Sequence, residues 1–155
     1  MRIHMIAVGT KMPGWVNDAF GDYAKRLPKD CALVLHEIPM VKRSKTVSVE
    51  KARQKESEQI LETIPKNTHV VAMEVTGKAW STEQLAQQLN QWRDAGGDVC
   101  LLIGGPDGLD EACRTAAHQC WSLSPLTLPH PLVRVVLAEQ LYRAWSINNN
   151  HPYHR

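Results

Sequence analysis

Short apolar runs rich in β-branched residues alternate along the chain with segments of helical periodicity. A run of four to eight apolar residues bounded by turn signals is typical of a buried strand. The runs predict strands over residues 3–9, 33–38, 69–75, 99–105 and 121–128.

Three of the intervening segments have the spacing of amphipathic helices. Residues 15–27 repeat apolar side chains at helical intervals, and the segment 81–92 opens with Ser81 followed three residues later by Gln84, which predicts a capping box. A last helix begins near Pro131, a residue favoured in the first turn of helices. Its predicted apolar face consists of Leu132, Val136, Leu137, Leu141 and Trp145.

This alternation predicts an α/β fold, a single domain over residues 1–155 whose mostly parallel sheet is flanked by helices on both faces. Ligands in such sheets bind beyond the carboxyl ends of the strands. The segment 40–55 is polar and basic and follows Pro39, and it is the stretch whose order is in doubt.

Composition narrows the class of protein. The chain is 43% hydrophobic and 22% charged, as is ordinary for a globular protein, and has no apolar run long enough to span a bilayer. The opening "MRIHMIAVGTKMP" is interpreted as a first strand and not as a signal peptide. Its four cysteines form no C-x-x-C pair, and Cys100 in "DVCLLI" is expected to pack as a small hydrophobe. We therefore expect a cytoplasmic protein without a membrane partner.

Charge is uneven although its sum is only +2. Lys42, Arg43 and Lys45 cluster in "MVKRSK". Such a run is either a solvated surface loop or a site for phosphate groups, and charge alone favours the solvated loop.

The segment "IGGPDG" follows the fourth predicted strand. Gly104 and Gly105 allow a sharp bend and the close approach of a ligand, and Pro106-Asp107-Gly108 is typical of a turn. The dinucleotide fingerprint, the phosphate-binding P-loop and the nucleophile elbow are all absent. Taken alone, this turn is either structural or part of a ligand site.

The histidines and one arginine allow alternatives. His36 is expected to pack within a strand, and His130 to cap a helix as a polar residue. His151 and His154 lack a third ligand at a known spacing, so no metal site is predicted. Arg134 lies in the first turn of a helix, where a cation opposes the dipole, so it either pairs with a buried acid or binds an anionic ligand.

Taken together, these segments form a longer pattern. The stretches "AVGTKMPGWV", "KRLPKD", "GKAWST", "LLIGGPDGL", "WSLSPLTLPHPLVRVVLAEQLYRAWSI" and "NHPYHR" closely resemble the RlmH-type methyltransferases of the SPOUT superfamily. The resemblance extends over essentially the whole chain. It departs from the family pattern at Asp107, which stands where a glutamate is usual, and the tail stops at Arg155.

The resemblance implies a C-terminal deep trefoil knot, which periodicity does not reveal because knots are nearly absent from the usual topology rules. It also implies a homodimer that binds S-adenosyl-L-methionine in the knot and uses no metal. The implied reaction is methylation of N3 of a pseudouridine in 23S rRNA, in the large ribosomal subunit or the assembled ribosome.

The resemblance also assigns roles to residues. The cofactor pocket is expected to contain Met73, Gly104, Leu123, Ser124, Pro125, Leu126, Thr127 and Leu128. The catalytic, acceptor-side group is expected to contain Arg134, His151, Tyr153, His154 and Arg155, with His154 as the leading base. RNA phosphates would be held by Lys42, Arg43 and Lys45, with Lys11 as a further candidate.

Two alternatives to these assignments stay open. The tail is a frayed terminus if His151 to Arg155 take no part in the reaction. The whole protein could instead be a non-catalytic, ribosome-associated binding module that keeps the knot. A third class, an unrelated α/β nucleotide-binding protein, fits the composition but not the long motif.

Overall fold

A five-stranded, wholly parallel sheet forms the centre of the molecule. The computed structural model describes residues 1–155 and places the strands in the order β2-β1-β4-β3-β5. The strands are β1 (Arg2–Val8), β2 (Ala32–Ile38), β3 (Thr68–Ala79), β4 (Asp98–Ile103) and β5 (Gln119–Ser122). The predicted α/β class is confirmed.

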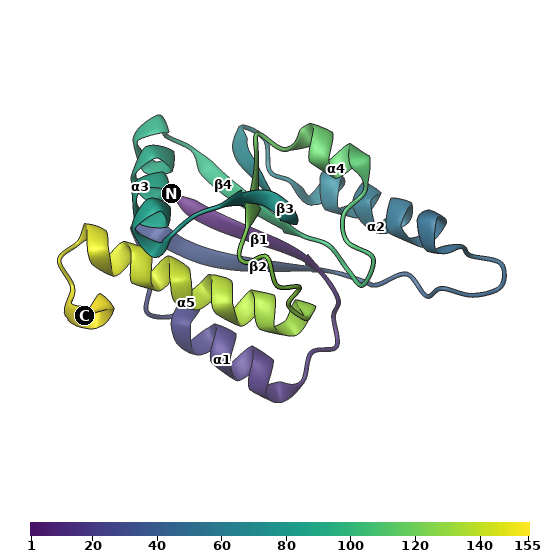
Figure 1. Cartoon of the computed structure of the whole chain (residues 1–155), viewed down its shortest axis with the longest axis horizontal. Coiled ribbons are helices and arrows are strands. Elements are labelled where there is room, and N and C mark those ends of the chain that lie inside the picture. The colour runs from purple at the N-terminus through teal and green to yellow at the C-terminus, as the bar shows by residue number, and fades with distance from the viewer.

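Helices cover both faces of this sheet (Figure 1). They are α1 (Gly14–Ala24), α2 (Val49–Thr63), α3 (Thr82–Ala95), α4 (Glu111–Ala116) and α5 (His130–Asn148), and short 3₁₀ turns span Lys29–Cys31 and Pro152–His154. Helices α1, α3 and α5 pack together on one face, whereas α2 and α4 lie on the other.

Alternating side chains of the strands form two separate cores. Along β1, Ile3 and Met5 belong to the large core beneath α1, α3 and α5, whereas Ile6 and Val8 belong to the smaller core beneath α2 and α4. Cys100 lies in the smaller core and is fully buried, as expected for a small hydrophobe. Because both faces are covered, the central strands read as continuous apolar runs.

The fifth strand differs from its prediction. It ends at Ser122, and the rest of the predicted 121–128 strand is a loop. Pro125 and Pro129 cannot donate to a strand ladder, and the Ser122 and Ser124 hydroxyls bond local backbone groups instead. This leaves the carboxyl edge of the sheet open beside β3 and β4.

Helices α2 and α4 were not predicted. Residues 49–55, within the segment whose order was in doubt, form the first part of α2, and Ser48 caps that helix by accepting a hydrogen bond from the Lys51 backbone N–H. The buried face of α2 contains Glu56, only 2% exposed, beside Ala52 and Ile60. A carboxylate on the buried face obscured the apolar periodicity.

Helix α3 has the predicted capping box between Ser81 and Gln84. The apolar face predicted for α5 is partly wrong, because Leu132 is 39% exposed whereas Arg134 and Ala138 are buried. None of the helices combines the length and the apolar character needed to cross a membrane.

Candidate active site

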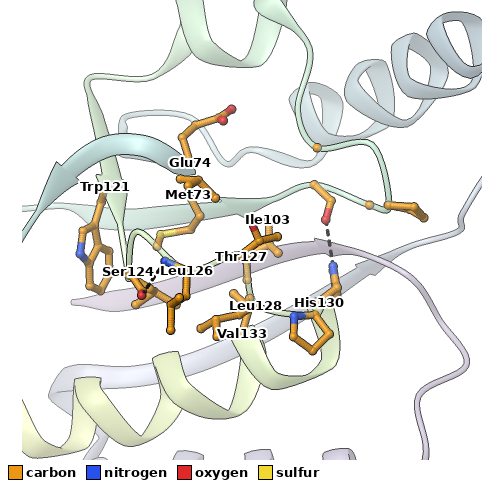
Figure 2. Close-up of a pocket in the computed structure, with 17 residues that line it drawn as sticks. Met73, Glu74, Ile103, Trp121, Ser124, Leu126, Thr127, Leu128, His130 and Val133 are labelled. Carbon is orange, nitrogen blue, oxygen red and sulfur yellow. Dashed lines mark hydrogen bonds between the residues drawn. The ribbon is translucent and has the colours of Figure 1, made fainter.

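A cavity of about 400 Å³ lies at the carboxyl edge of β3, β4 and β5 (Figure 2). Its walls are the ends of β4 and β5, the middle of β3 at residues 73–75, the turn 104–108, the loop 123–129 and the first turn of α5. All the residues predicted for the cofactor pocket line this cavity except Pro125. The position agrees with the general rule for ligands of parallel sheets.

A bulge in β3 shapes one wall of the cavity. Met73 and Lys78 both pair with Trp121 of β5, so the residues between them loop out of the ladder. A Cβ at Gly77 would lie 2.8 Å from the backbone of Cys120 and of Trp121, and only glycine allows this approach. The bulge brings Glu74 and Val75 to the cavity rim.

The loop 123–129 presents unpaired backbone groups to the cavity. Leu123, Thr127 and Leu128 line it, and their backbone N–H groups have no hydrogen-bond partner within the chain. The loop is shaped locally instead, since Ser122 Oγ donates to the Ser124 carbonyl over 3.0 Å and Ser124 Oγ accepts from the Leu126 N–H over 2.9 Å. Apolar side chains combined with a few free polar groups are typical of small-molecule sites.

The turn 104–108 forms the opposite wall of the cavity. Its backbone conformation requires two of its glycines, Gly104 and Gly108. A Cβ at Gly104 would lie 2.4 Å from the backbone carbon of Gly108, and Gly108 has a φ of 76°. The Gly108 N–H donates to the Gly105 carbonyl over 3.0 Å and closes the turn. The fold of the turn therefore already requires glycine at position 104, and a further role of Gly104 in admitting a ligand stays a prediction.

His130 joins this turn to α5. Its Nδ1 is 2.9 Å from the Gly104 carbonyl oxygen, and its Nε2 accepts a hydrogen bond of 3.0 Å from Arg134 Nε. The two partners define the neutral tautomer, with the proton on Nδ1. Burial lowers the pKa of His130, and the nearby Arg134 guanidinium lowers it further.

The expectation that His130 caps a helix is wrong. The residue before α5 is Pro129, and no side chain caps the helix. His130 lines the cavity and is a site residue that sequence reasoning missed. Its only signal in the sequence is the spacing of four to Arg134, which places both side chains on one helix face.

Arg134 is 1% exposed and fully engaged with the protein. Its Nη1 donates to Glu37 of β2 and its Nη2 donates to the Gly9 carbonyl, both over 2.7 Å. Of the two alternatives for Arg134, the structure shows the pairing with an acid. A direct role toward a substrate stays a prediction.

The tail is ordered against the far end of α5. Tyr153 donates its hydroxyl proton to Glu139 over 3.0 Å, its ring lies 4.6 Å from that of Tyr142, and the Arg143 guanidinium lies over it. Burial raises the pKa of the Tyr153 hydroxyl above its ordinary range. His154 Nδ1 is 3.2 Å from Ser146 Oγ. A frayed terminus does not describe these residues.

One chain does not bring the predicted catalytic group together. Arg134 lies near the start of α5, whereas His154 contacts Ser146 near its end and Tyr153 reaches back to Glu139 at the middle of the helix. Twelve residues of α-helix separate Arg134 from Ser146, which is roughly 18 Å. Figure 1 shows the C-terminus beyond the end of α5, away from the loop that precedes the helix.

The basic residues expected to hold RNA phosphates do not all have the same surroundings. Lys11, Lys42 and Lys45 are exposed, and none of them forms an ion pair. Arg43 instead bonds Glu56 and Asp107 within the chain, so the expectation that it is free to bind phosphate is not met. No group of three or more His, Cys, Asp or Glu side chains is arranged to hold a metal ion.

Comparison with known proteins identifies the family. The model of the family described as "Predicted SPOUT methyltransferase" matches residues 1–154, and the chain belongs to this family. It is 61% identical over 155 residues to a protein named "Ribosomal RNA large subunit methyltransferase H" from Hahella chejuensis, covering 100% of this chain and 99% of that protein. A protein of the same name from Marinomonas sp. is also 61% identical, with 100% of both chains covered.

A solved structure supports the fold alone. It is described as the structure of a probable methylase family protein from Haemophilus influenzae Rd KW20. It aligns with a TM-score of 0.55 at 13% identity and covers 99% of this chain and 70% of the other.

Proposed function

We propose that this chain, as one SPOUT domain over residues 1–155, transfers a methyl group from S-adenosyl-L-methionine to N3 of a pseudouridine in 23S rRNA of the large ribosomal subunit. The observation that carries the proposal is the cavity at the strand ends, because it gathers nearly all the residues expected to bind the cofactor. The relatives named as large-subunit rRNA methyltransferases over full length support the same substrate.

The cavity fits the cofactor in size and lining. Its volume of about 400 Å³ is within the range of small-molecule sites. Met73, Ile103 and Leu128 offer apolar contact, whereas the free N–H groups of Thr127 and Leu128 can bond a purine or an amino-acid moiety. Bound there, S-adenosyl-L-methionine would supply an electrophilic methyl group. The prolines around the loop limit its freedom before binding and so reduce the ordering cost.

The protein's own contribution on the acceptor side is to remove a proton and stabilise charge. N3–H of pseudouridine is a weakly acidic imide, so a base must take its proton before or during attack. His154 is the proposed base, with His151 and Tyr153 placing it, since a neutral imidazole nitrogen can accept a proton. Arg155 and Arg134 would stabilise the negative charge that develops on the neighbouring carbonyl oxygens.

The proposed assembly is a homodimer, in which the tail of one copy reaches the cavity of the other. Its support is the separation of Arg134 from the tail within one chain, which leaves the acceptor side of each cavity incomplete. The implied trefoil knot is proposed with it. The exposed Lys11, Lys42 and Lys45 would bind RNA phosphates, and an rRNA substrate would place the protein in the cytoplasm.

The test of the function has two stages. Isothermal titration should first show binding of S-adenosyl-L-methionine to the purified protein. Ribosomes lacking the modification should then acquire label from the radioactive cofactor, and mapping should place it at N3 of one pseudouridine. Cofactor binding without transfer to any ribosomal particle would instead support the non-catalytic binding module.

The shared site is tested by mixing two inactive variants. One lacks residues 151–155, and the other carries Thr127→Trp, which fills the cavity from an exposed loop position. Hybrid dimers contain one intact cavity and one intact tail, so activity should return on mixing. If subunit exchange is confirmed and every mixture stays inactive, a shared site is excluded.

A further inference from the structure

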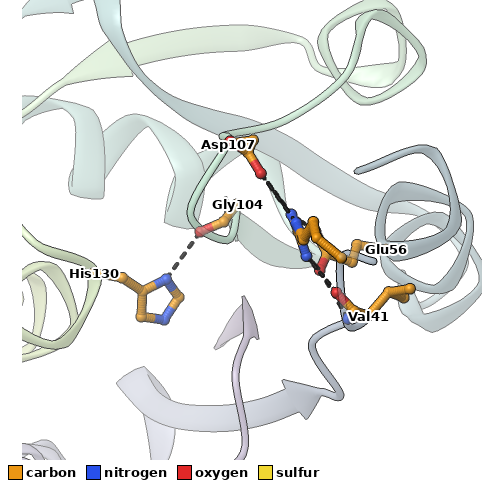
Figure 3. A network of polar contacts seen from close by, with 6 residues as sticks. Val41, Glu56, Gly104, Asp107 and His130 are labelled. Atoms are coloured by element: carbon orange, nitrogen blue, oxygen red, sulfur yellow. Dashed lines mark hydrogen bonds and ion pairs between the residues drawn. The ribbon is translucent and has the colours of Figure 1, made fainter. Parts of the chain in front are cut away.

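A cluster of charged side chains joins the basic segment 42–45 to the turn that lines the cavity (Figure 3). The Arg43 guanidinium bonds both oxygens of Glu56 and, through Nε and Nη2, one oxygen of Asp107 at 3.1 and 2.9 Å. Glu56 Oε2 also accepts a hydrogen bond of 2.9 Å from the Val41 N–H. The cluster thus connects α2, the 40s segment and the turn 104–108.

The burial of Glu56 makes this arrangement specific. Glu56 is 2% exposed, and Arg43 is the cation that pairs with it. A buried carboxylate is tolerated when it is paired and hydrogen-bonded, and it is costly when its partner is removed. The hydrogen bond to Glu56, followed by that to Asp107, raises the pKa of Arg43. Arg43 is therefore held at this position and not free in solvent.

The cluster reaches the turn at two points. Asp107 is bonded directly, and a Cβ at Gly105 would lie 3.3 Å from Glu56 Oε1, so the carboxylate lies close beside the backbone of Gly105. Gly104, Gly105, Pro106 and Gly108 of the same turn line the cavity. Within the turn, the Gly108 N–H to Gly105 carbonyl bond is the single backbone hydrogen bond. Side-chain hydrogen bonds to the turn come from Arg43, through Asp107, on one side and from His130, through the Gly104 carbonyl, on the other.

We propose that Arg43 is a positioning residue for the methyl-donor pocket, which holds the turn 104–108 through Asp107 and Glu56, and that it is not a phosphate ligand. The proposal rests on the proposed function for the identity of the ligand. The proposal gives Arg43 a different role from Lys42 and Lys45. These lysines lie in the same segment, but neither forms an ion pair within the chain.

The first measurement is the Kd for S-adenosyl-L-methionine without RNA. Asp107→Ala and Arg43→Gln should raise this Kd by about 5- to 150-fold, the range typical of energetic coupling between two parts of a protein. Lys42→Gln, Lys45→Gln and the exposed Lys51→Gln on α2 should leave the Kd unchanged. Arg43→Lys should recover only part of the loss, because lysine cannot bond two carboxylates in a fork.

The Asp107 variant separates an effect on cofactor binding from a loss of stability. Arg43→Gln leaves Glu56 buried without a cation and so risks misfolding. Asp107→Ala keeps the Arg43–Glu56 pair and removes only the partly exposed partner, so its melting temperature should match the wild type while its Kd rises. The double variant should bind the cofactor no more weakly than Arg43→Gln alone, because both changes break one connection.

The second measurement is the salt dependence of binding to purified large ribosomal subunits. Each lysine that contacts phosphate contributes about 1 to the slope of log K against log salt. Lys42→Gln and Lys45→Gln should reduce the slope, whereas Arg43→Gln and Asp107→Ala should not. Wild-type cofactor affinity in Asp107→Ala, or a reduced salt slope in Arg43→Gln, would overturn the proposal. A wild-type protein that binds no cofactor would overturn the proposed function itself, and this inference with it.

Discussion

The two ends of helix α5 use the same residue types in opposite ways. At its start, Arg134 is 1% exposed and bonds His130, Glu37 and the Gly9 carbonyl. At its end, Arg143 is 33% exposed, pairs with Glu139 and covers the ring of Tyr153. The first arrangement shapes a cavity from within the fold. The second holds polar groups at the surface, where a substrate can reach them.

The two ends of α5 differ in how easily their polar groups can exchange hydrogen-bond partners. A buried polar network has one low-energy arrangement, because each unpaired member is costly. A half-exposed cluster held by aromatic contacts retains water as an alternative partner, so it can exchange partners at low cost. In the proposed reaction, the start of α5 therefore holds the cavity wall and places the Arg134 charge beside it, whereas the end of α5 holds the tail with the proposed base.

The largest expected effect comes from removing the tail. Deletion of residues 151–155 should reduce methyl transfer by about 10² to 10⁴, the usual cost of losing a positioned general base. Binding of S-adenosyl-L-methionine should hardly change, because the residues expected to bind the cofactor lie at the strand ends and in the loop 123–128, not in the tail. Single-turnover kinetics and titration measure the two quantities. Full turnover by the truncated protein would place the base elsewhere.

The two arginines of α5 offer a direct comparison of stability. Arg134→Ala should lower the free energy of unfolding by about 3 kcal/mol, since it opens a buried network and leaves His130 without its donor. Arg143→Ala should cost less than about 1 kcal/mol, as is usual for an exposed ion pair. Urea denaturation of both variants measures the difference. Equal losses would show that the two ends are not organised differently.

Gly104 tests whether the turn is a structural element. Gly104→Ala should cost about 1–3 kcal/mol and weaken cofactor binding, because the new Cβ displaces the Gly108 backbone. Gly21→Ala is the matched control: it lies within α1 with open space around it and should stabilise by about 0.5–1 kcal/mol. A Gly104→Ala protein of wild-type stability would return the glycine to a purely ligand-facing role.

The smallest expected effect is a dependence on pH. The folded state lowers the pKa of His130 from its ordinary 6.5, so the unfolded chain takes up the proton first. Stability from neutral His130 is thus present above about pH 6.5 and is lost as the pH falls below that value. Between about pH 7.5 and pH 5.5 the loss should reach at most about 1.4 kcal/mol.

His130→Asn retains a donor near the Nδ1 position but does not titrate, so it should lose less stability over this range than the wild type does. Lowering of the His36 pKa, mainly by burial, contributes a similar slope to both proteins. Parallel pH profiles of wild type and variant would show that His130 does not titrate with unfolding.

Local patterns determined much of the fold. The apolar runs identified five strands because both faces of the parallel sheet are covered, and the Ser81 capping box marked the start of α3. The end-to-end resemblance singled out the loop 123–128, which lines the cavity, and the tail. These features could be predicted because each one depends on neighbours within a few residues or on a long, ordered motif.

The tertiary structure alone determined which polar groups meet. Arg134 pairs with Glu37 across 97 residues, Arg43 with Asp107 across 64, and His130 reaches Gly104 across 26. Nothing in the local spacing of these residues distinguishes a buried charge from a solvated one, and Glu56 even concealed the helix that carries it. Burial and long-range pairing depend on which strand ends lie side by side, and only the folded sheet order β2-β1-β4-β3-β5 decides that.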